Sequence, residues 1–200
     1  MAVEGAKVIT SKAILSYPNL LVARAGKGAN AKAKFSGALV WTPELIKTPD
    51  GAKCFDAMKK AVLAAAESKF GTKAAEMFRI KSLRTPFRDD AEAKGYPAGS
   101  IFLNVRTEQK PACVFAYAGP DGKPQRMTDE EIKVQMYPGA LVRASIVAFP
   151  YEAEGNKGVS FALNNLQKVG EGERIDGRQA AEDEFDVDLS AAPASIDGLI

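Results

Sequence analysis

Apolar residues alternate with polar ones in six segments of this chain, and this period of two is the pattern of a strand with one buried face. The alternation predicts strands over residues 9–17, 34–41, 101–106, 112–117, 140–151 and 159–168. A helical spacing is strong only in Lys53–Phe70, where Phe55, Met58 and Val62 share one face. The predicted fold is therefore mainly β with one principal α-helix (α+β), an OB-type Greek-key barrel, although a β-sandwich fits the strand count nearly as well.

Prolines and glycines set the expected boundaries of these elements. Pro18-Asn19 is expected to end the first strand, and Thr48-Pro49-Asp50-Gly51 is a strong turn signal before the helix. A short second helix is predicted over Thr72–Phe78. Residues 81–100 then form a long loop, and a loop of this length in a compact domain is usually functional.

Charge divides the chain into two parts. Residues 1–170 contain 25 Lys and Arg against 16 Asp and Glu, whereas residues 171–200 contain two arginines against nine carboxylates. We therefore predict an OB-fold nucleic-acid-binding domain over residues 1–177 and a disordered acidic tail over residues 178–200. A basic body with an acidic tail suits a protein that binds a polyanion and carries its own competitor, although many acidic tails only add solubility.

Composition excludes several kinds of site. The chain has no histidine, which excludes Ser-His-Asp and Cys-His catalysis and every metal site that needs an imidazole. The two cysteines, Cys54 and Cys113, are expected to be buried thiols. No apolar run reaches the length of a membrane span and the N-terminus does not have the pattern of a secretory signal, so a cytosolic protein without membrane contact is expected.

The long loop carries the best cluster of candidate DNA contacts. It interleaves cations with aromatic residues, namely Arg84, Phe87, Arg88, Lys94 and Tyr96. Such a segment suits a groove that follows a phosphate backbone and stacks bases. The alternative is an ordinary solvated loop whose aromatic rings turn inward.

Two strands add further candidates. On residues 101–106, Phe102 and Arg106 lie on the face opposite the apolar one, and Phe102 would either stack a base or pack under the long loop. On residues 140–151, the outward face carries Arg143, Phe149 and Tyr151, with Lys157 in the hairpin that follows. That face would contact a nucleotide or, alternatively, the tail or a partner chain. The remaining large aromatic residues, Trp41, Phe35 and Phe161, are expected in the core.

Two other motifs suggest sites of different chemistry. Asp89, Asp90 and Glu92 would be the carboxylates of a Mg²⁺-dependent nuclease, but neighbouring carboxylates in one loop more often form local ion pairs. Gly26-Lys27-Gly28 lacks the glycine spacing and the following helix of a phosphate-binding loop. No catalytic residue, metal or cofactor is therefore expected.

The tail mixes carboxylates with apolar residues, which is more than a solvating tail needs. Its candidate partner-binding residues are Glu182, Asp183, Glu184, Phe185, Asp186 and Asp188. They would dock in a basic, apolar pocket of a partner or fold back over the DNA groove, unless the tail serves solubility alone.

Several segments together resemble one protein family. The most specific is Gly155–Lys168, which reads GNKGVSFALNNLQK. Weaker matches are Gly172-Glu173, Asp176-Gly177-Arg178, Ala181–Phe185, Ser16–Leu20, Pro86–Asp89 and Gly95-Tyr96. With these residues the chain resembles, from about residue 8 to 187, a bacteriophage family associated with single-stranded DNA binding through an OB fold and an acidic C-terminal tail.

This resemblance implies a non-enzymatic phage protein that coats single-stranded DNA in replication or recombination, with little sequence preference. It would act in the cytoplasm of the infected bacterial host and recruit phage or host replication proteins through the tail. The matching positions that would line the groove are Arg88, Tyr96, Lys157, Asn164 and Asn165, although the two asparagines could instead satisfy backbone groups. Duplex DNA as a ligand, the nuclease, and a basic-faced protein-interaction module remain the alternatives.

Overall fold

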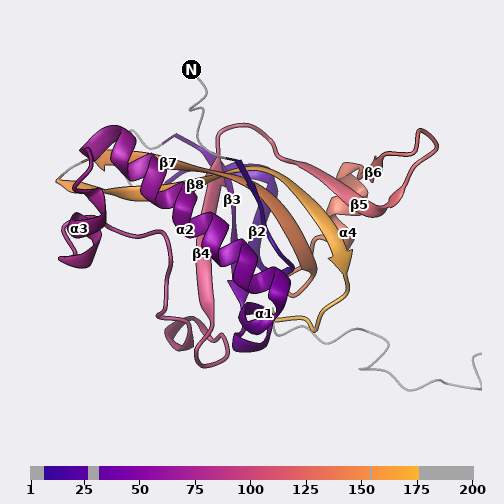
Figure 1. Ribbon diagram of the computed structural model, residues 1–200. Helices are drawn as coiled ribbons and strands as arrows, with labels where there is room; N and C mark the ends of the chain where they lie inside the picture. Colours follow the sequence, from indigo (N-terminus) through magenta and orange to yellow (C-terminus); the bar gives the residue numbers. More distant parts are fainter. Residues whose placement is uncertain (1–6, 27–31, 154, 176–200) are drawn as a thin grey trace, which may run out of the picture.

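A computed structural model describes residues 7–26, 32–153 and 155–175 of the chain (Figure 1). The strands are β1 (Lys7–Ile9), β2 (Ala13–Arg24), β3 (Lys34–Trp41), β4 (Ile101–Thr107), β5 (Ala112–Ala118), β6 (Pro124–Arg126), β7 (Leu141–Ala153) and β8 (Asn156–Gly170). The helices are α1 (Pro43–Lys47), α2 (Pro49–Phe70), α3 (Ala74–Arg79) and α4 (Asp129–Gln135), with a 3₁₀ turn η1 (Glu92–Lys94).

Five of these strands close into a barrel. The pairing order is β7-β2-β3-β4-β8, and β8 returns to β7 along a long antiparallel hairpin. Taken in chain order, the barrel strands are paired 1-2-3-5-4-1, and the contact between β4 and β8 is parallel. This connectivity is that of an OB barrel, so the expected mainly β, OB-type fold is confirmed and the sandwich is excluded.

One edge of β8 is shared by three segments in succession. β5 pairs with Asn165 to Lys168, and β4 pairs with Phe161 and Ala162. Where β4 and β8 diverge, the start of the long loop fills the gap, because Arg84 bridges to Gly158 on β8 and Arg88 bridges to Phe102 on β4. The segment therefore satisfies backbone groups that the open seam of the barrel would leave without partners.

Helix α2 lies across the front of the barrel in Figure 1 and supplies much of the core. The Phe55 ring meets the fully buried Trp41 ring edge-on at 5.4 Å between centroids. The helix begins at Pro49, four residues earlier than expected, because the Thr48 hydroxyl accepts a hydrogen bond from the Gly51 N–H at 2.9 Å and caps it. The residues expected to form a turn are therefore its first turn.

The prediction that Pro18-Asn19 ends the first strand is wrong. β2 continues to Arg24 because a one-residue bulge accommodates the proline. Ser16 pairs with Ala38 and Asn19 with Ser36, so β2 has one residue more than β3 between these pairs. A bulge is one of the few places where a strand tolerates a residue without an N–H. The sequence patterns also missed β1, β6, α1 and α4, all of which are short.

The predictions that both cysteines are buried thiols and that the large aromatic residues lie in the core are largely confirmed. Cys54 and Cys113 are free and buried, and burial raises the pKa of Cys113 to about 11. Trp41 and Phe161 are buried in the core, whereas Phe35 is only half-buried near the open end of β3.

In the described part of the chain, no helix is both long and apolar enough to span a membrane. The predicted tail, residues 178–200, lies outside the described residues.

The close approach of the loop to β8 depends on Gly158. A Cβ atom at this position would lie 2.3 Å from the Arg84 carbonyl oxygen, so Gly158→Ala must push the inserted segment out of the seam. We expect a decrease of about 1–3 kcal/mol in the free energy of unfolding, measured by chemical denaturation. Gly170→Ala in the same strand is the control, since its nearest neighbouring atom would be 3.5 Å away, and an equal decrease in both variants would contradict this account.

Candidate nucleic-acid interface

The outer face of β2, β3 and β4 is the best candidate for a nucleic-acid site. Strand register places Asn19, Ser36 and Arg106 in one row across this face, with Arg24 beside Lys34 in the next. A hollow of about 700 Å³ opens over these rows, and Lys32 also lines it. The strand pairing therefore gathers cations from three segments that are far apart in the sequence.

Two further hollows extend this one along β2. The second, of about 530 Å³, shares Asn19 and Arg24 with the first and reaches α4. The third, of about 100 Å³, shares Tyr17 and Pro138 with the second and ends at Lys94. We call the three together the basic groove. Its cations are Arg24, Lys32, Lys34, Lys94, Arg106, Lys133 and Arg174.

Among the described residues, no Asp or Glu side chain lines the basic groove. The nearest paired carboxylate is Glu108, which Lys32 and Lys34 hold at 3.2 and 3.5 Å. The hydrogen bond from Lys32 and the charges of both lysines lower the pKa of Glu108. One carboxylate against this many cations leaves the groove electropositive, which favours a polyanion.

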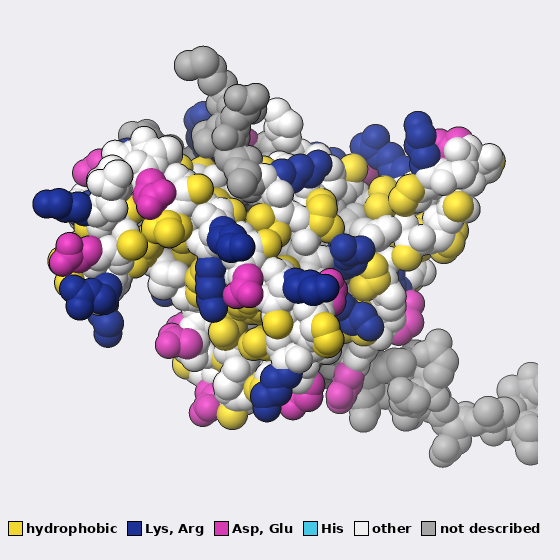
Figure 2. Space-filling view, viewed as in Figure 1, with side chains coloured by type: hydrophobic (Ala, Val, Ile, Leu, Met, Phe, Trp, Pro, Cys, Tyr) yellow, Lys and Arg dark blue, Asp and Glu magenta, His cyan; other side chains and the backbone are white. Residues whose placement is uncertain are grey.

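The α2 side of the molecule differs. Figure 2 shows basic and acidic side chains interspersed with apolar ones over this face, with cations gathered at the α3 end and near the β5–β6 hairpin. A mixed surface of this kind has no single sign of charge to attract DNA. The groove on β2–β4 is therefore the stronger candidate on electrostatic grounds.

The long loop covers the other half of the β2–β4 face. The Tyr96 ring packs edge-on against Phe102 at 5.4 Å between centroids, and its hydroxyl donates to Ser16 Oγ at 2.9 Å. Phe102 and Tyr96 are only 3% and 9% exposed. The expectation that these rings are exposed for stacking is wrong, and the alternative that they pack inward beneath the loop is confirmed, because together with Val40 they form a small second core there.

Four other predicted residues meet at a separate hollow of about 910 Å³ between α2, α3 and residues 81–90, which we call the α3 hollow. Arg84, Arg88 and Tyr151 line it with Phe87, whose ring packs on Phe55 and Phe161 of the core. Asp89 and Asp90 lie in the same wall and partly cancel the cations. The predicted contacts that line the basic groove are Lys94, Arg106 and the largely buried Tyr96.

The remaining predicted contacts lie on β7 and β8. Arg143 Nε donates to the Thr10 carbonyl at 3.0 Å, and Phe149 is half-buried. Lys157 lies opposite Glu152 in the hairpin. Asn164 and Asn165 are exposed at a bulge within β8, and the Asn165 side chain accepts a hydrogen bond from the Ala112 N–H at 3.2 Å. The structure does not bring these residues into the groove.

The carboxylates of the alternative nuclease site are all exposed. Asp89 and Asp90 follow Arg88 in the loop, and Glu92 begins the next 3₁₀ turn. Within the described ranges, no group of three Asp, Glu or Cys side chains is placed to hold a metal ion.

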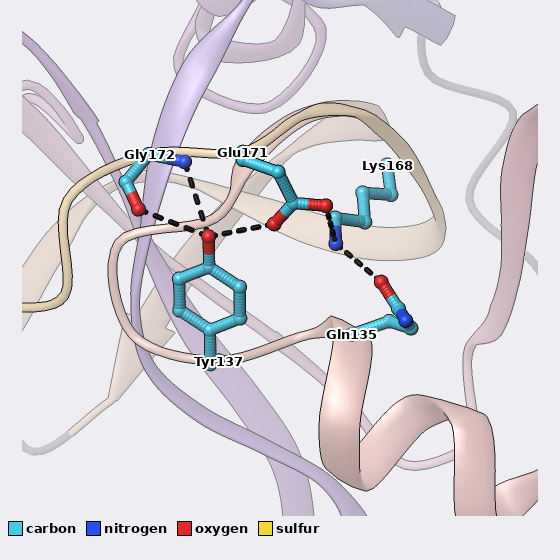
Figure 3. A network of polar contacts seen from close by, with 5 residues as sticks. All are labelled: Gln135, Tyr137, Lys168, Glu171 and Gly172. Atoms are coloured by element: carbon cyan, nitrogen blue, oxygen red, sulfur yellow. Dashed lines mark hydrogen bonds and ion pairs between the residues drawn. The ribbon is translucent and has the colours of Figure 1, made fainter. Parts of the chain in front are cut away.

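A polar network fixes the chain where it leaves the barrel beside the groove (Figure 3). The Tyr137 hydroxyl lies 2.8 Å from Glu171 Oε2 and 2.9 Å from the Gly172 carbonyl, and accepts from the Gly172 N–H at 3.1 Å. Lys168, buried against the Tyr137 ring, pairs with Glu171 Oε1 at 2.5 Å and also bonds Gln135. Residues 171–175 therefore run past α4, where Arg174 lines the second hollow and Ile175 the third.

Sequence reasoning missed the groove cations on β2 and β3. Arg24 and Lys34 pair with each other, but Arg24 lies beyond the proline that was expected to end its strand. The general behaviour of OB folds could have found them. In these folds the second and third barrel strands, here β3 and β4, and the loop between the first two, here between β2 and β3, usually bind the nucleic acid.

A closed OB barrel with a cation-lined groove over its first three strands is the arrangement of an OB-type nucleic-acid-binding domain. The family model described as "Enterobacter phage Enc34, ssDNA-binding protein" matches residues 6–195. The chain belongs to this family, which confirms the resemblance seen in its sequence.

Solved structures of similar fold include proteins of two phages. The single-stranded DNA-binding protein from bacteriophage Enc34 in complex with ssDNA has a TM-score of 0.64 and 16% identity over 84% of this chain and 89% of that one. A second structure of the bacteriophage Enc34 protein gives 0.62 and 17% over 90% of each chain. The single-stranded DNA-binding protein gp2.5 of bacteriophage T7 gives 0.53 and 14% over 90% and 99%. No curated protein matches this chain in sequence.

The network at Tyr137 predicts a pH dependence of stability. Hydrogen bonds from Lys168 and Tyr137 lower the pKa of Glu171 below its ordinary value of 4.5. Its contribution to folding is therefore complete above pH 4.5 and is lost as the pH falls through the lowered pKa. We expect Glu171→Gln to destabilise the protein at pH 6–7, with a difference from wild type that shrinks below about pH 4.5, in denaturation curves across pH. The control is Glu173→Gln, and a pH-independent difference for Glu171→Gln would contradict this role.

Proposed function

We propose that this protein binds single-stranded DNA along the basic groove and coats it with little sequence preference during phage replication or recombination. The observation that carries the proposal is the cluster of cations on the outer face of β2–β4, where no described carboxylate lines the groove. Membership of the Enc34 single-stranded DNA-binding family supports the same ligand. The site of action is the cytoplasm of the infected bacterial host.

Binding of this kind needs no chemical step. Lys34, Arg24 and Arg106 take up phosphates and release the counterions condensed on the DNA, which makes affinity fall as salt rises. Contacts to the backbone carry no sequence information, so any single strand is accepted. Asn19, Ser36 and Asn104, on the same face, supply short polar side chains between the cations.

The acidic tail is proposed to compete with DNA for this groove. The described chain ends at Ile175, which lines the third hollow, so the tail starts next to the cations that DNA would occupy. Its partner-binding residues, Glu182 to Glu184, Phe185, Asp186 and Asp188, are then released when DNA displaces them. In that state they recruit phage or host replication proteins.

Neutralising the groove tests the site. We expect Arg24→Gln and Arg106→Gln each to weaken binding to a labelled oligo-dT, because each variant leaves a phosphate without its cation. The slope of log affinity against log salt should fall in magnitude by about 0.7 for each phosphate that the variant no longer neutralises. The measurement is fluorescence anisotropy over a salt series, with duplex DNA in parallel.

The matched control is Lys60→Gln, which removes an exposed cation from α2 on the mixed-charge side. It should leave the salt slope unchanged. Equal effects in all three variants would mean that net charge alone governs binding and would overturn the assignment to this groove.

Removing the tail tests the competition. Deleting residues 179–200 removes six Asp and Glu side chains and no Lys or Arg, so we expect tighter binding to oligo-dT at low salt. The gain should be smaller at high salt, where the tail is already screened. Binding assays of the full chain and the deletion across the same salt series give this comparison. Unchanged affinity at low salt would contradict the competition.

A further inference from the structure

Tyr17 occupies an unfavourable backbone conformation in the middle of β2. Its φ is +46°, in the left-handed region that disfavours any side chain with a Cβ atom. It lies in the bulge between Ser16 and Asn19, directly before Pro18. Glycine would take this conformation without strain, so the fold by itself does not call for an aromatic residue here.

Neighbouring side chains hold the bulge in place. Asn19 Nδ2 donates to the Tyr17 carbonyl at 3.2 Å and lies 3.3 Å from Ser36 Oγ on β3. The bulge is thereby tied to the row that contains Arg106, at the floor of the basic groove. Backbone outliers that the surrounding structure maintains in this way are concentrated at functional sites.

The Tyr17 side chain is 65% exposed although the residues around it are buried or half-buried. It lines both the second and the third hollow, so it lies at the junction of the basic groove. Arg24 is in one of these hollows and Lys94 in the other. An aromatic ring between cations is the arrangement that stacks a base while its flanking phosphates are neutralised.

Tyr117 provides a contrast within the same protein. It is also exposed, at 55%, but its ring is stacked on Phe115 with 4.7 Å between centroids, so one face is already covered. It lies on the β5–β6 hairpin, which projects away from the barrel in Figure 1. It lines none of the three hollows that make up the basic groove.

We propose that Tyr17 is the stacking platform for a nucleobase of the single strand held in the basic groove. The proposal rests on the proposed function and adds to it the residue that contacts a base. The strained bulge lifts the ring out of the sheet surface, and the cations of the adjoining hollows hold the phosphates on either side. Because every base has an aromatic face, such a contact tolerates any sequence.

A tryptophan at position 17 reports stacking directly. The chain has a single tryptophan, Trp41, which is 0% exposed in the core and should be insensitive to DNA. We expect the emission of Tyr17→Trp to be quenched when oligo-dT binds. Tyr117→Trp is the matched control and should not be quenched. Quenching of the control alone, or of neither variant while anisotropy reports binding, would overturn the proposal and leave the proposed function intact.

Tyr17→Gly separates a role in binding from a role in folding. Glycine relieves the unfavourable φ, so the midpoint of thermal unfolding should rise or stay unchanged. Removal of the ring should nevertheless weaken binding to oligo-dT by about 5- to 140-fold, the range for one stacked base. Tyr17→Phe should bind like wild type. Wild-type affinity in the glycine variant would refute stacking, whereas absence of oligo-dT binding in the unmodified protein would refute the proposed function itself.

Discussion

The shared edge of β8 is the constraint on which the rest of this structure depends. β4 and β5 each pair with only part of it, and the seam that β4 leaves open is filled by residues 84–88 of the long loop. Backbone groups at such a seam need hydrogen-bond partners. Because the loop enters there, its later part is carried over the outer face of the sheet, where Tyr96 packs on Phe102 and bonds Ser16.

The long loop covers one half of the outer face of β2–β4, so only the other half is open to a ligand. Beyond Ser16 the outer surface of β2, β3 and β4 is exposed, and there the strands place Arg24, Lys34 and Arg106 side by side. The network around Tyr137 then brings the last described residues past the same surface, ending at Ile175. The groove and the start of the acidic tail are therefore neighbours because of the barrel's connectivity.

The sequence predicted the barrel well, because alternation reports which face of a strand is buried, and most of β4, β7 and β8 alternates outside the bulge at Asn164 and Asn165. It did not predict the bulge at Tyr17–Pro18, since a proline usually ends a strand and only the register with β3 shows that this one does not. The pattern could not choose between the two alternatives for Phe102, stacking or packing under the loop, for a related reason. Alternation places it on the outer face correctly, but whether that face is exposed to solvent depends on the long loop, whose position no local pattern predicts.

Helix α4 was predictable in principle, because the capping box of Thr128 and Glu131 is a local signal of a helix start. The groove cations could not be grouped from spacing alone, since Arg24 and Arg106 meet only through strand pairing with β3.

Lysine footprinting with and without oligo-dT tests most directly whether single-stranded DNA lies over β2–β4. Lys32 and Lys34 are 74% and 43% exposed and therefore open to an acylating reagent, and Lys94 lines the far end of the groove. The account predicts that DNA protects these three, while Lys59 and Lys81 of the α3 hollow stay reactive. Protection of Lys59 and Lys81 with Lys34 still reactive would contradict it and would place the strand between α2 and the long loop.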